Sequence, residues 1–406
     1  MASLYSRPCP SGRSHPAPRF EAAPDLSALS WTDAAALLLP LPLILCANLA
    51  DRGLPTLSAR GDVKRGTYPP AAAFGFGPVD NGFGLVTWAL LAAISLGTVV
   101  VGLLVAIAGG LLSGRSGTHG LPAYGAIIAA AGVVCCLVVW GRGRTQVARV
   151  LPLNPASAVH ATALILALVL LASQLGAVLT VNTISLQARS GLSIGPLDLI
   201  VQEIPYLLAA LFGVGLLVRR PGRETWARLG YDRPQVWHVL LAVAAAGVFF
   251  AASSGATLLA QRLTPGLEHQ IEDLNQHLFA GISGPLGVAA IALAPGICEE
   301  ALFRGALQPR FGILFTSVLF AAVHTQYGLS IDTVTVFLLA CCLGLIRRYA
   351  NTTTSTLCHA TYNGLAASAL PGPLLLPGIL VEALLVAAAL GAFVFTTRLG
   401  VRAAES

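Results

Sequence analysis

The sequence predicts an all-α protein, a polytopic bundle of about ten membrane-spanning helices. Two observations predict this class. The composition is far from that of a soluble globular domain, with 55% hydrophobic and 10% charged residues among 406 and a mean hydropathy of +0.76. The apolar residues also gather into runs of about 20 residues, the length that a helix needs to cross the hydrocarbon core of a bilayer.

Apolar runs follow one another along the chain. Those in the first two thirds cover about 83–112, 121–140, 156–181, 194–218 and 236–260. An earlier run, 34–50, is short and contains Pro40 and Pro42, so we expect it to be a marginal span, re-entrant or interfacial. Residues 1–29 are polar and proline-bearing, which predicts a leader that is disordered or held at the membrane surface.

Positive charge marks the joints between these runs. The formal charge is +6, and nearly all the basic residues are arginine, because Lys64 is the only lysine. The arginines gather chiefly in the joints 142–149, 219–233 and 347–348, which the positive-inside rule places on the cytoplasmic side. The basic balance is thus explained by membrane topology, and no nucleic-acid partner is predicted. The eight cysteines include no CxxC pair and are expected to be reduced, packed thiols.

Polar side chains inside three apolar segments form the candidate site. A charged side chain at the bilayer centre costs about 3 kcal/mol on insertion scales, so it normally faces a bundle interior or a wet cavity. The segments carry, in order, Glu299, Glu300 and Arg304, then Phe320 and His324, then His359 and Asn363. His160 and His238 have no such companions and are expected to be structural or interfacial.

Helical spacing gives the acids different environments. Glu300 and Arg304 are four positions apart and share a helix face, whereas Glu299 is rotated by about 100°. A carboxylate paired with arginine should stay ionised, so Glu299 is the better candidate general base. His324 could orient the attacked water, and His359 with Asn363 could donate to an oxyanion. Because no nucleophile is evident, direct attack by water is the simpler prediction. Phe320 is most simply a packing residue.

The motifs Glu299-Glu300-x-x-x-Arg304, Phe320-x-x-x-His324 and His359-x-x-x-Asn363 resemble the three-motif signature of the CPBP family. That family groups type II CAAX prenyl endopeptidases with bacterial relatives linked to bacteriocin processing and self-immunity. The resemblance covers roughly residues 284–370. It implies an intramembrane endopeptidase in which Glu299 and His324 activate water, Arg304 holds Glu300, and His359 with Asn363 stabilises the oxyanion.

The resemblance leaves the cofactor open. Family members are often described as metalloproteases, and Glu299, His324 and His359 would make a three-ligand zinc site with water in the fourth position. The sharper zinc signal, H-E-x-x-H on one helix, does not occur in the sequence. The prediction is therefore no cofactor or zinc, with metal-free chemistry slightly favoured.

Three regions follow from the resemblance: a leader at 1–29, an N-terminal transmembrane extension of unknown role at 30–235, and a CPBP-like intramembrane peptidase core at 236–400. The predicted partners are membrane lipid and a peptide or protein substrate, such as a prenylated CAAX protein, a leader peptide, a bacteriocin or another membrane-associated peptide. Abundant Ala, Gly and Arg with a single lysine suggest a GC-rich genome, so a multi-pass protein of the bacterial cell membrane is expected. The oligomeric state is not predicted.

Two other classes of function remain open. A catalytically silent membrane scaffold or an immunity-type protein would keep the fold and tolerate Glu299→Gln. A transporter would use intramembrane acids as ion or proton relays, and four further acids lie in or beside apolar runs: Asp198, Glu203, Asp332 and Glu382. The acids crowd into one half of the chain, whereas a transporter built from repeats needs matching broken helices in both halves. The transporter is therefore the less favoured class.

Overall fold

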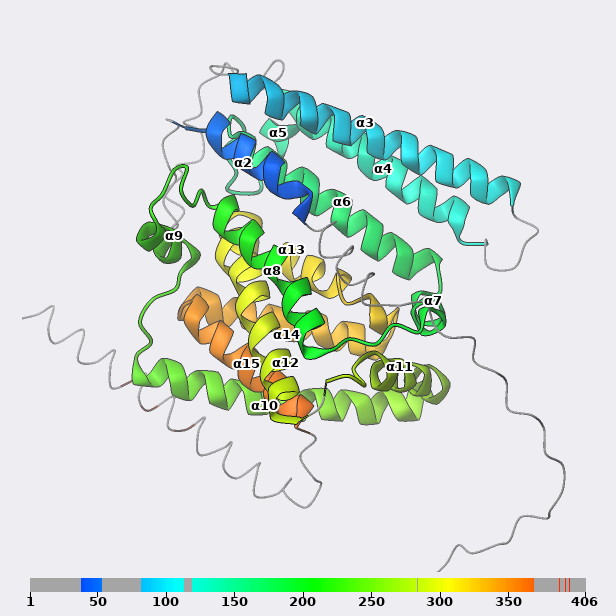
Figure 1. The fold of residues 1–406 in the computed structure, drawn as a ribbon, viewed down its shortest axis with the longest axis vertical. Helices are drawn as coiled ribbons and strands as arrows, with labels where there is room; N and C mark the ends of the chain where they lie inside the picture. Colours follow the sequence, from blue (N-terminus) through cyan, green and yellow to red (C-terminus); the bar gives the residue numbers. More distant parts are fainter. Residues whose placement is uncertain are drawn as a thin grey trace, which may run out of the picture.

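The computed structural model describes residues 38–52, 82–112, 119–282 and 284–368, together with positions 387, 391 and 394. All regular secondary structure in this part of the chain is helical, which confirms the all-α class. Figure 1 shows the order α2 (Pro40–Ala50), α3 (Gly82–Leu111), α4 (Leu121–Val139), α5 (Gly141–Val147), α6 (Ala158–Thr180), α7 (Thr183–Ser190), α8 (Pro196–Gly213), α9 (Gly222–Leu229), α10 (Val236–Leu263), α11 (Pro265–Leu278), α12 (Gly284–Glu299), the π-helix η2 (Glu300–Leu307), α13 (Gln308–Ala322), the 3₁₀ turn η3 (Thr325–Tyr327), α14 (Ile331–Tyr349) and α15 (Thr352–Ala367).

The chain is a multi-pass membrane protein. Within the described ranges, six helical stretches are long and apolar enough to cross a membrane: α3, α4, α6, α8, α10 and the stretch Gly284–Ala322. The predicted count of about ten is not confirmed. Helix α2 has 11 residues, about 16 Å of a hydrocarbon core that is about 30 Å thick, and α15 is short and rich in threonine. The predicted leader, most of the loop after α2, and Glu382 lie outside the described residues.

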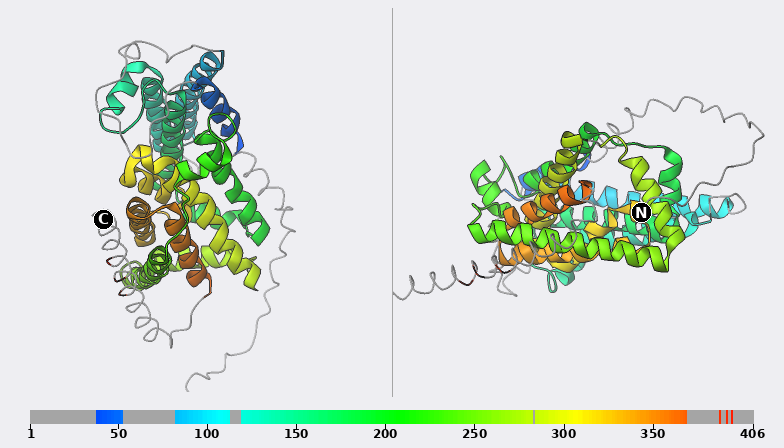
Figure 2. Two further views of the ribbon diagram at one scale, coloured as in Figure 1. Left: turned by 90° about the vertical axis from the view of Figure 1, so that its left-hand side faces the viewer. Right: turned by 90° about the horizontal axis from the view of Figure 1, so that it is seen from below.

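The helices form a stack that runs from the N-terminal hairpin at one edge of the molecule to α10 at the other. Helices α3 and α4 lie along one edge of the molecule in Figure 1 and α10 along the opposite edge, with α6, α8, α12 and α13 between them. The left view in Figure 2 shows the same stacking from the side. The N-terminal helices therefore cover one flank of the segment that carries the three motifs.

Small residues let α3 and α4 approach closely. A Cβ atom on Gly102 would lie 2.3 Å from the backbone nitrogen of Ala129, and one on Gly125 would lie 2.3 Å from that of Ala106. In a membrane, helix association depends on van der Waals packing, so glycine at such a crossing permits contacts that a side chain would prevent. This hairpin then packs on α6 through α4.

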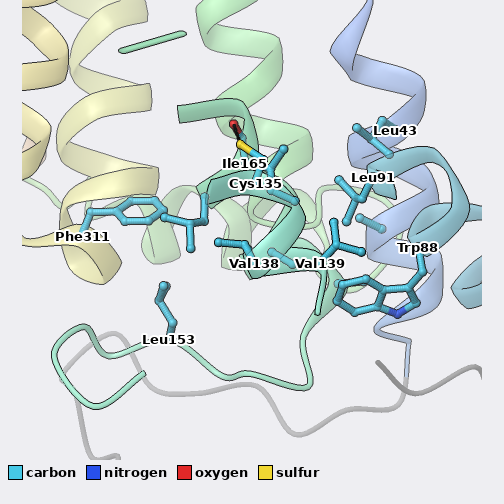
Figure 3. Close-up of a cluster of buried hydrophobic side chains, with 13 residues drawn as sticks. Leu43, Trp88, Leu91, Cys135, Val138, Val139, Leu153, Ile165 and Phe311 are labelled. Carbon is cyan, nitrogen blue, oxygen red and sulfur yellow. Dashed lines mark hydrogen bonds between the residues drawn. The ribbon is translucent and has the colours of Figure 1, made fainter. Parts of the chain in front are cut away.

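A buried cluster joins the N-terminal helices to the motif segment. Figure 3 shows Leu43 of α2, Trp88 and Leu91 of α3, and Cys135, Val138 and Val139 of α4 around Ile165 of α6. Phe311 of α13, 3% exposed, belongs to the same cluster. The extension and the motif segment thus share one apolar core.

The joints gather at two ends, as alternation of the apolar runs predicts. At the arginine-rich end, Arg310 Nη1 donates to the Pro152 carbonyl at 3.5 Å, and Thr352 N donates to the Gly230 carbonyl at 2.9 Å. At the other end, Ile194 N donates to the Leu278 carbonyl at 2.7 Å, and Thr183 Oγ1 donates to the Thr325 carbonyl at 3.0 Å. Which end faces the cytoplasm stays a prediction from the positive-inside rule.

We expect Gly102→Ala to destabilise the protein, because the added methyl group would meet the backbone of α4. Gly97→Ala on the same helix is the matched control, since a Cβ there would meet no atom within 4 Å. Thermal unfolding of the purified protein in detergent should show a lower Tm for Gly102→Ala alone. Equal midpoints for both variants would contradict the close crossing of α3 and α4.

Candidate active site

The first motif lies on a helix whose backbone is irregular. Pro295 is inside α12 and has no N–H, so the carbonyl of Ile291, four residues earlier, loses its helical partner. Asn363 of α15 replaces that partner, with its Nδ2 donating to the Ile291 carbonyl at 3.2 Å. The amide of the third motif therefore stabilises the break in the helix of the first motif, a contact that spacing alone did not predict.

After Glu299 the helix widens into the π-helix η2, and its end is marked by a bond from Gln308 N to the carbonyl of Phe303, five residues earlier. π-helical turns are rare in proteins, and those that do occur are often found at functional sites. Glu300 and Arg304 both lie on η2. The helix was predicted to be an ordinary α-helix through this motif, so the π-helix is a finding of the structure. Gly312, with φ of 77°, then breaks the helix and redirects the chain.

A fully buried ion pair lies at the centre of the site. Arg304 Nε is 3.5 Å from Glu300 Oε2, and both side chains are 0% exposed. The guanidinium carbon is 4.7 Å from the centre of the Phe320 ring, a cation–π arrangement. Phe320 is thus more than neutral packing, because its ring face covers the arginine of the first motif.

His359 connects the two acids. Its Nδ1 is 3.2 Å from Glu300 Oε1, and its Nε2 is 3.9 Å from Glu299 Oε2. The backbone of α15 comes this close because Gly296 of α12 leaves room for it: a Cβ there would lie 3.1 Å from the nitrogen of Ala360. Glu299 itself is 6% exposed and accepts no hydrogen bond at Oε2. This oxygen is available to another donor.

His324 follows the end of α13 and lies beside the ring of Phe320. Its Nδ1 lies 2.8 Å from the Phe320 carbonyl, and its ring centre is 4.8 Å from that of Phe320. A carbonyl only accepts hydrogen bonds, so Nδ1 carries the proton and the neutral ring keeps Nε2 as an acceptor. His324 also interacts electrostatically with His359 and Arg304. A water molecule between the elements would find an acceptor at Nε2.

The structure therefore brings the predicted site residues into one region, some by direct contact and His324 through the ring of Phe320. Glu299, Glu300, Arg304 and His359 contact one another directly. His324 joins them through the ring of Phe320, which also stands 5.9 Å from the ring of His359. Asn363 lies one helical turn beyond His359, with its amide on Ile291. The chemical roles of these residues stay predictions.

Helix α8 adds two side chains that belong to none of the motifs. Glu203, 7% exposed, interacts electrostatically with Glu299 and leaves Oε2 without a hydrogen bond. Tyr206, three positions later, interacts with both acids. The sequence marks Glu203 only as an acid in an apolar run, and no sequence pattern marks Tyr206 as a site residue. Both are brought to the site by the packing of α8 on α12, a long-range contact that sequence spacing does not contain.

The zinc alternative depends on the donor atoms that remain. Among the described residues, no group of three or more His, Cys, Asp or Glu side chains is arranged to hold a metal ion. His324 Nδ1 faces the Phe320 carbonyl and His359 Nδ1 faces Glu300, which leaves Nε2 of each ring for another partner, as is usual for zinc-ligating histidines. These hydrogen bonds therefore do not decide between metal-free and zinc-dependent chemistry. Metal dependence of the reaction stays a prediction for experiment.

Taken together, the fold and the site define a multi-pass membrane protein with a buried cluster of acid, arginine and histidine between its helices. Residues 281–365 match the family model described as "Type II CAAX prenyl endopeptidase Rce1-like". The match supports assignment to the CPBP or CAAX protease family, as the three motifs predicted. At the family level it points to a hydrolase of the CAAX protease type. No curated protein and no solved structure matches the chain significantly.

We expect Arg304→Met to destabilise the fold by about 3–5 kcal/mol, because it leaves the Glu300 carboxylate buried without its cation. The double variant Glu300→Gln with Arg304→Met removes both charges and should recover part of the loss. Thermal unfolding in detergent measures both, with Arg348→Met, an exposed arginine, as the control. A double variant no more stable than Arg304→Met would contradict the pairing.

Proposed function

We propose that the protein is an intramembrane endopeptidase that hydrolyses a peptide bond with water activated by Glu299. The observation that carries the proposal is the position of Glu299: it lies beside His359, while its neighbour Glu300 is held by Arg304. Two acids with such different partners suit a division between a working base and a structural carboxylate. The family match over residues 281–365 supports the same class of reaction.

The proposed reaction needs a base, Glu299, a residue that orients the water, His324, and two donors to the oxyanion, which are described below. The Glu299 carboxylate takes a proton from water, and the water oxygen bonds to the scissile carbonyl carbon while the carbonyl electron pair moves onto oxygen. His324 Nε2 accepts a hydrogen bond from the same water and orients it. The tetrahedral intermediate then collapses: the carbonyl re-forms, the C–N bond breaks, and the leaving nitrogen takes the proton from Glu299.

Donors for the oxyanion come from α15. His359 Nδ1 donates to the Glu300 carboxylate, so Nε2, which faces Glu299, acts as a donor when the ring is the doubly protonated imidazolium. Asn363 has two N–H bonds at Nδ2, of which one is used on the Ile291 carbonyl. The second N–H is then the candidate donor to the oxyanion, and the first fixes its direction.

The proposed substrate is a membrane-associated peptide, with a prenylated CAAX sequence, a leader peptide and a bacteriocin as the classes to test. The support is the printed family name and the location of the site between apolar helices. Residence in a bacterial cell membrane is part of the proposal and rests on the Ala-, Gly- and Arg-rich composition.

Glu299→Gln is expected to lower peptidase activity by about 10²–10⁴-fold, the usual contribution of a general base, without unfolding the protein. His324→Ala should also lower activity, since it removes the acceptor at Nε2. The measurement is cleavage of a quenched fluorescent peptide library that includes a prenylated CAAX peptide, by purified protein in detergent. Glu272→Gln, an exposed acid on α11, is the control. Wild-type cleavage that persists in Glu299→Gln would overturn the assignment, and no cleavage by any form would favour a silent scaffold.

Metal removal gives a separate test of the mechanism. We expect activity to survive treatment with a strong zinc chelator, because the sequence contains no H-E-x-x-H zinc motif. Activity before and after chelation and after zinc is added back would be compared on the same peptide. Loss on chelation and recovery with zinc would replace the metal-free mechanism by a zinc-dependent one.

A further inference from the structure

A cavity lies between the N-terminal helices and the motif segment, and it shares Tyr206 and Phe303 with the surroundings of the acid cluster. Its volume is about 230 Å³, somewhat below the range of about 300–1,000 Å³ that is common for ligand pockets. One wall comes from α2 and α6, including Ile44, Ala163 and Leu166, and the other from α8 and η2, including Ala209 and Leu302. Most of these side chains are apolar, so the interior suits a hydrocarbon chain.

One end of this cavity is strongly basic. Arginines line it from three parts of the chain: Arg219 and Arg220 after α8, Arg228 on α9, and Arg310 on α13. Among the described residues that line the cavity, Asp51 is the one carboxylate. Asp51 is already engaged: it lies 3.6 Å from Arg219 and accepts hydrogen bonds from Ser157 Oγ and, at 2.7 Å, from Ala158 N.

The other arginines donate to carbonyl groups. Arg228 Nη1 donates to Gly305 at 3.3 Å, Arg310 Nη1 to Pro152 at 3.5 Å, and Arg220 Nη1 to Val214. Burial, followed by the positive charges of Arg310, Arg220 and Arg347, lowers the pKa of Arg228 to about 9. Among the described residues, four arginines line this end, with Asp51 in the lining and Glu224 interacting electrostatically with Arg220. In this part of the chain the basic groups thus outnumber the acids.

His160 supplies a neutral donor at the same place. It lines the cavity, and its Nδ1 accepts the N–H of Asn154 at 2.8 Å. The proton of the neutral ring is therefore on Nε2. His160 interacts electrostatically with Arg310, Arg228 and Arg219. An anion held by the arginines would thus have an N–H donor beside it, which gives this histidine a binding role that its isolated position in the sequence did not predict.

The surroundings favour a lipid over a folded partner. The basic end belongs to the joints that the positive-inside rule places on the cytoplasmic side, where anionic lipid headgroups lie. Basic pockets between membrane helices on that side are suited to phosphate headgroups. The acid cluster is on another side of Phe303: this residue lines the cavity, and its ring packs against Phe320 at 5.1 Å. Glu299, Glu300, His324 and His359 are not among the cavity-lining residues.

We propose that this cavity binds an anionic phospholipid, with the phosphate held by Arg220, Arg228 and Arg310 and one acyl chain between α2, α6 and α8. The inference goes beyond the proposed peptidase function and does not depend on it. It gives the N-terminal helices a definite role, because the bound chain would contact both the extension and the motif segment. Phosphate is the shared chemistry of a lipid headgroup and free inorganic phosphate, so an experiment must separate the two.

The experiment uses the full chain, purified in a neutral detergent and depleted of lipid. Phosphatidylglycerol, phosphatidylcholine and inorganic phosphate are titrated separately, and bound lipid is counted by native mass spectrometry alongside the thermal unfolding midpoint. We expect phosphatidylglycerol to bind and raise Tm, phosphatidylcholine to bind at least tenfold more weakly, and inorganic phosphate to leave Tm unchanged. A Tm rise with inorganic phosphate equal to that with phosphatidylglycerol would show a free-anion site and overturn the lipid assignment.

Variants locate the site. Arg228→Gln and Arg310→Gln should each weaken phosphatidylglycerol binding by about fivefold, the usual effect of one basic residue on an anionic headgroup. Arg233→Gln, exposed in the same joint, should bind as the wild type does. Ala209→Leu should weaken binding by filling the chain pocket, and if it does not fold, the arginine variants still decide. Unchanged affinity in both arginine variants, or equal affinity for the two lipids, would overturn the proposal.

Discussion

The buried pair of Arg304 and Glu300 is the interaction on which the centre of the structure depends. Two charges with 0% exposure are costly to remove from water. The two side chains are 3.5 Å apart and share no hydrogen bond, so the neighbouring groups matter: the Phe320 ring covers the guanidinium, and His359 Nδ1 faces the second carboxylate oxygen. One ion pair thus draws η2, α13 and α15 together and places the other motif residues around it.

Backbone irregularity is the second constraint. Helices inside a membrane must satisfy their own carbonyls, and non-helical or widened backbone is tolerated where other protein groups replace the missing bonds. Pro295 breaks a bond in α12, and Asn363 restores it from α15. The same contact holds α15 in the register that brings His359 to the acids. A residue expected to work only in chemistry therefore has a structural function as well, so its loss would affect both.

The sequence predicts correctly those features that depend on residues close together in the chain. The runs beginning at 121 and 236 start helices at Leu121 and Val236, and the spacing of Glu300 and Arg304 gives the ion pair. The π-helix was not predicted, because its widened turn depends on which partners surround η2. Glu203 and Tyr206 were not assigned to the site, because α8 and α12 are about 90 residues apart and only packing brings them together. The count of about ten spans is not confirmed within the described ranges, where a segment such as α15 is short and rich in threonine and so has no independent apolar signal.

The π-helix η2 contacts two chemically different environments. Arg304 of η2 pairs with Glu300 in a site that also contains the carboxyl groups of Glu299 and Glu203. Leu302, Phe303 and Ala306 of η2 face a cavity whose basic end contains several arginines and one acid. A site with excess positive charge is stabilised by an anion from outside. Since α2 and α6 line the second cavity, the lipid proposal makes the extension the part of the protein through which the motif helix would contact the lipid.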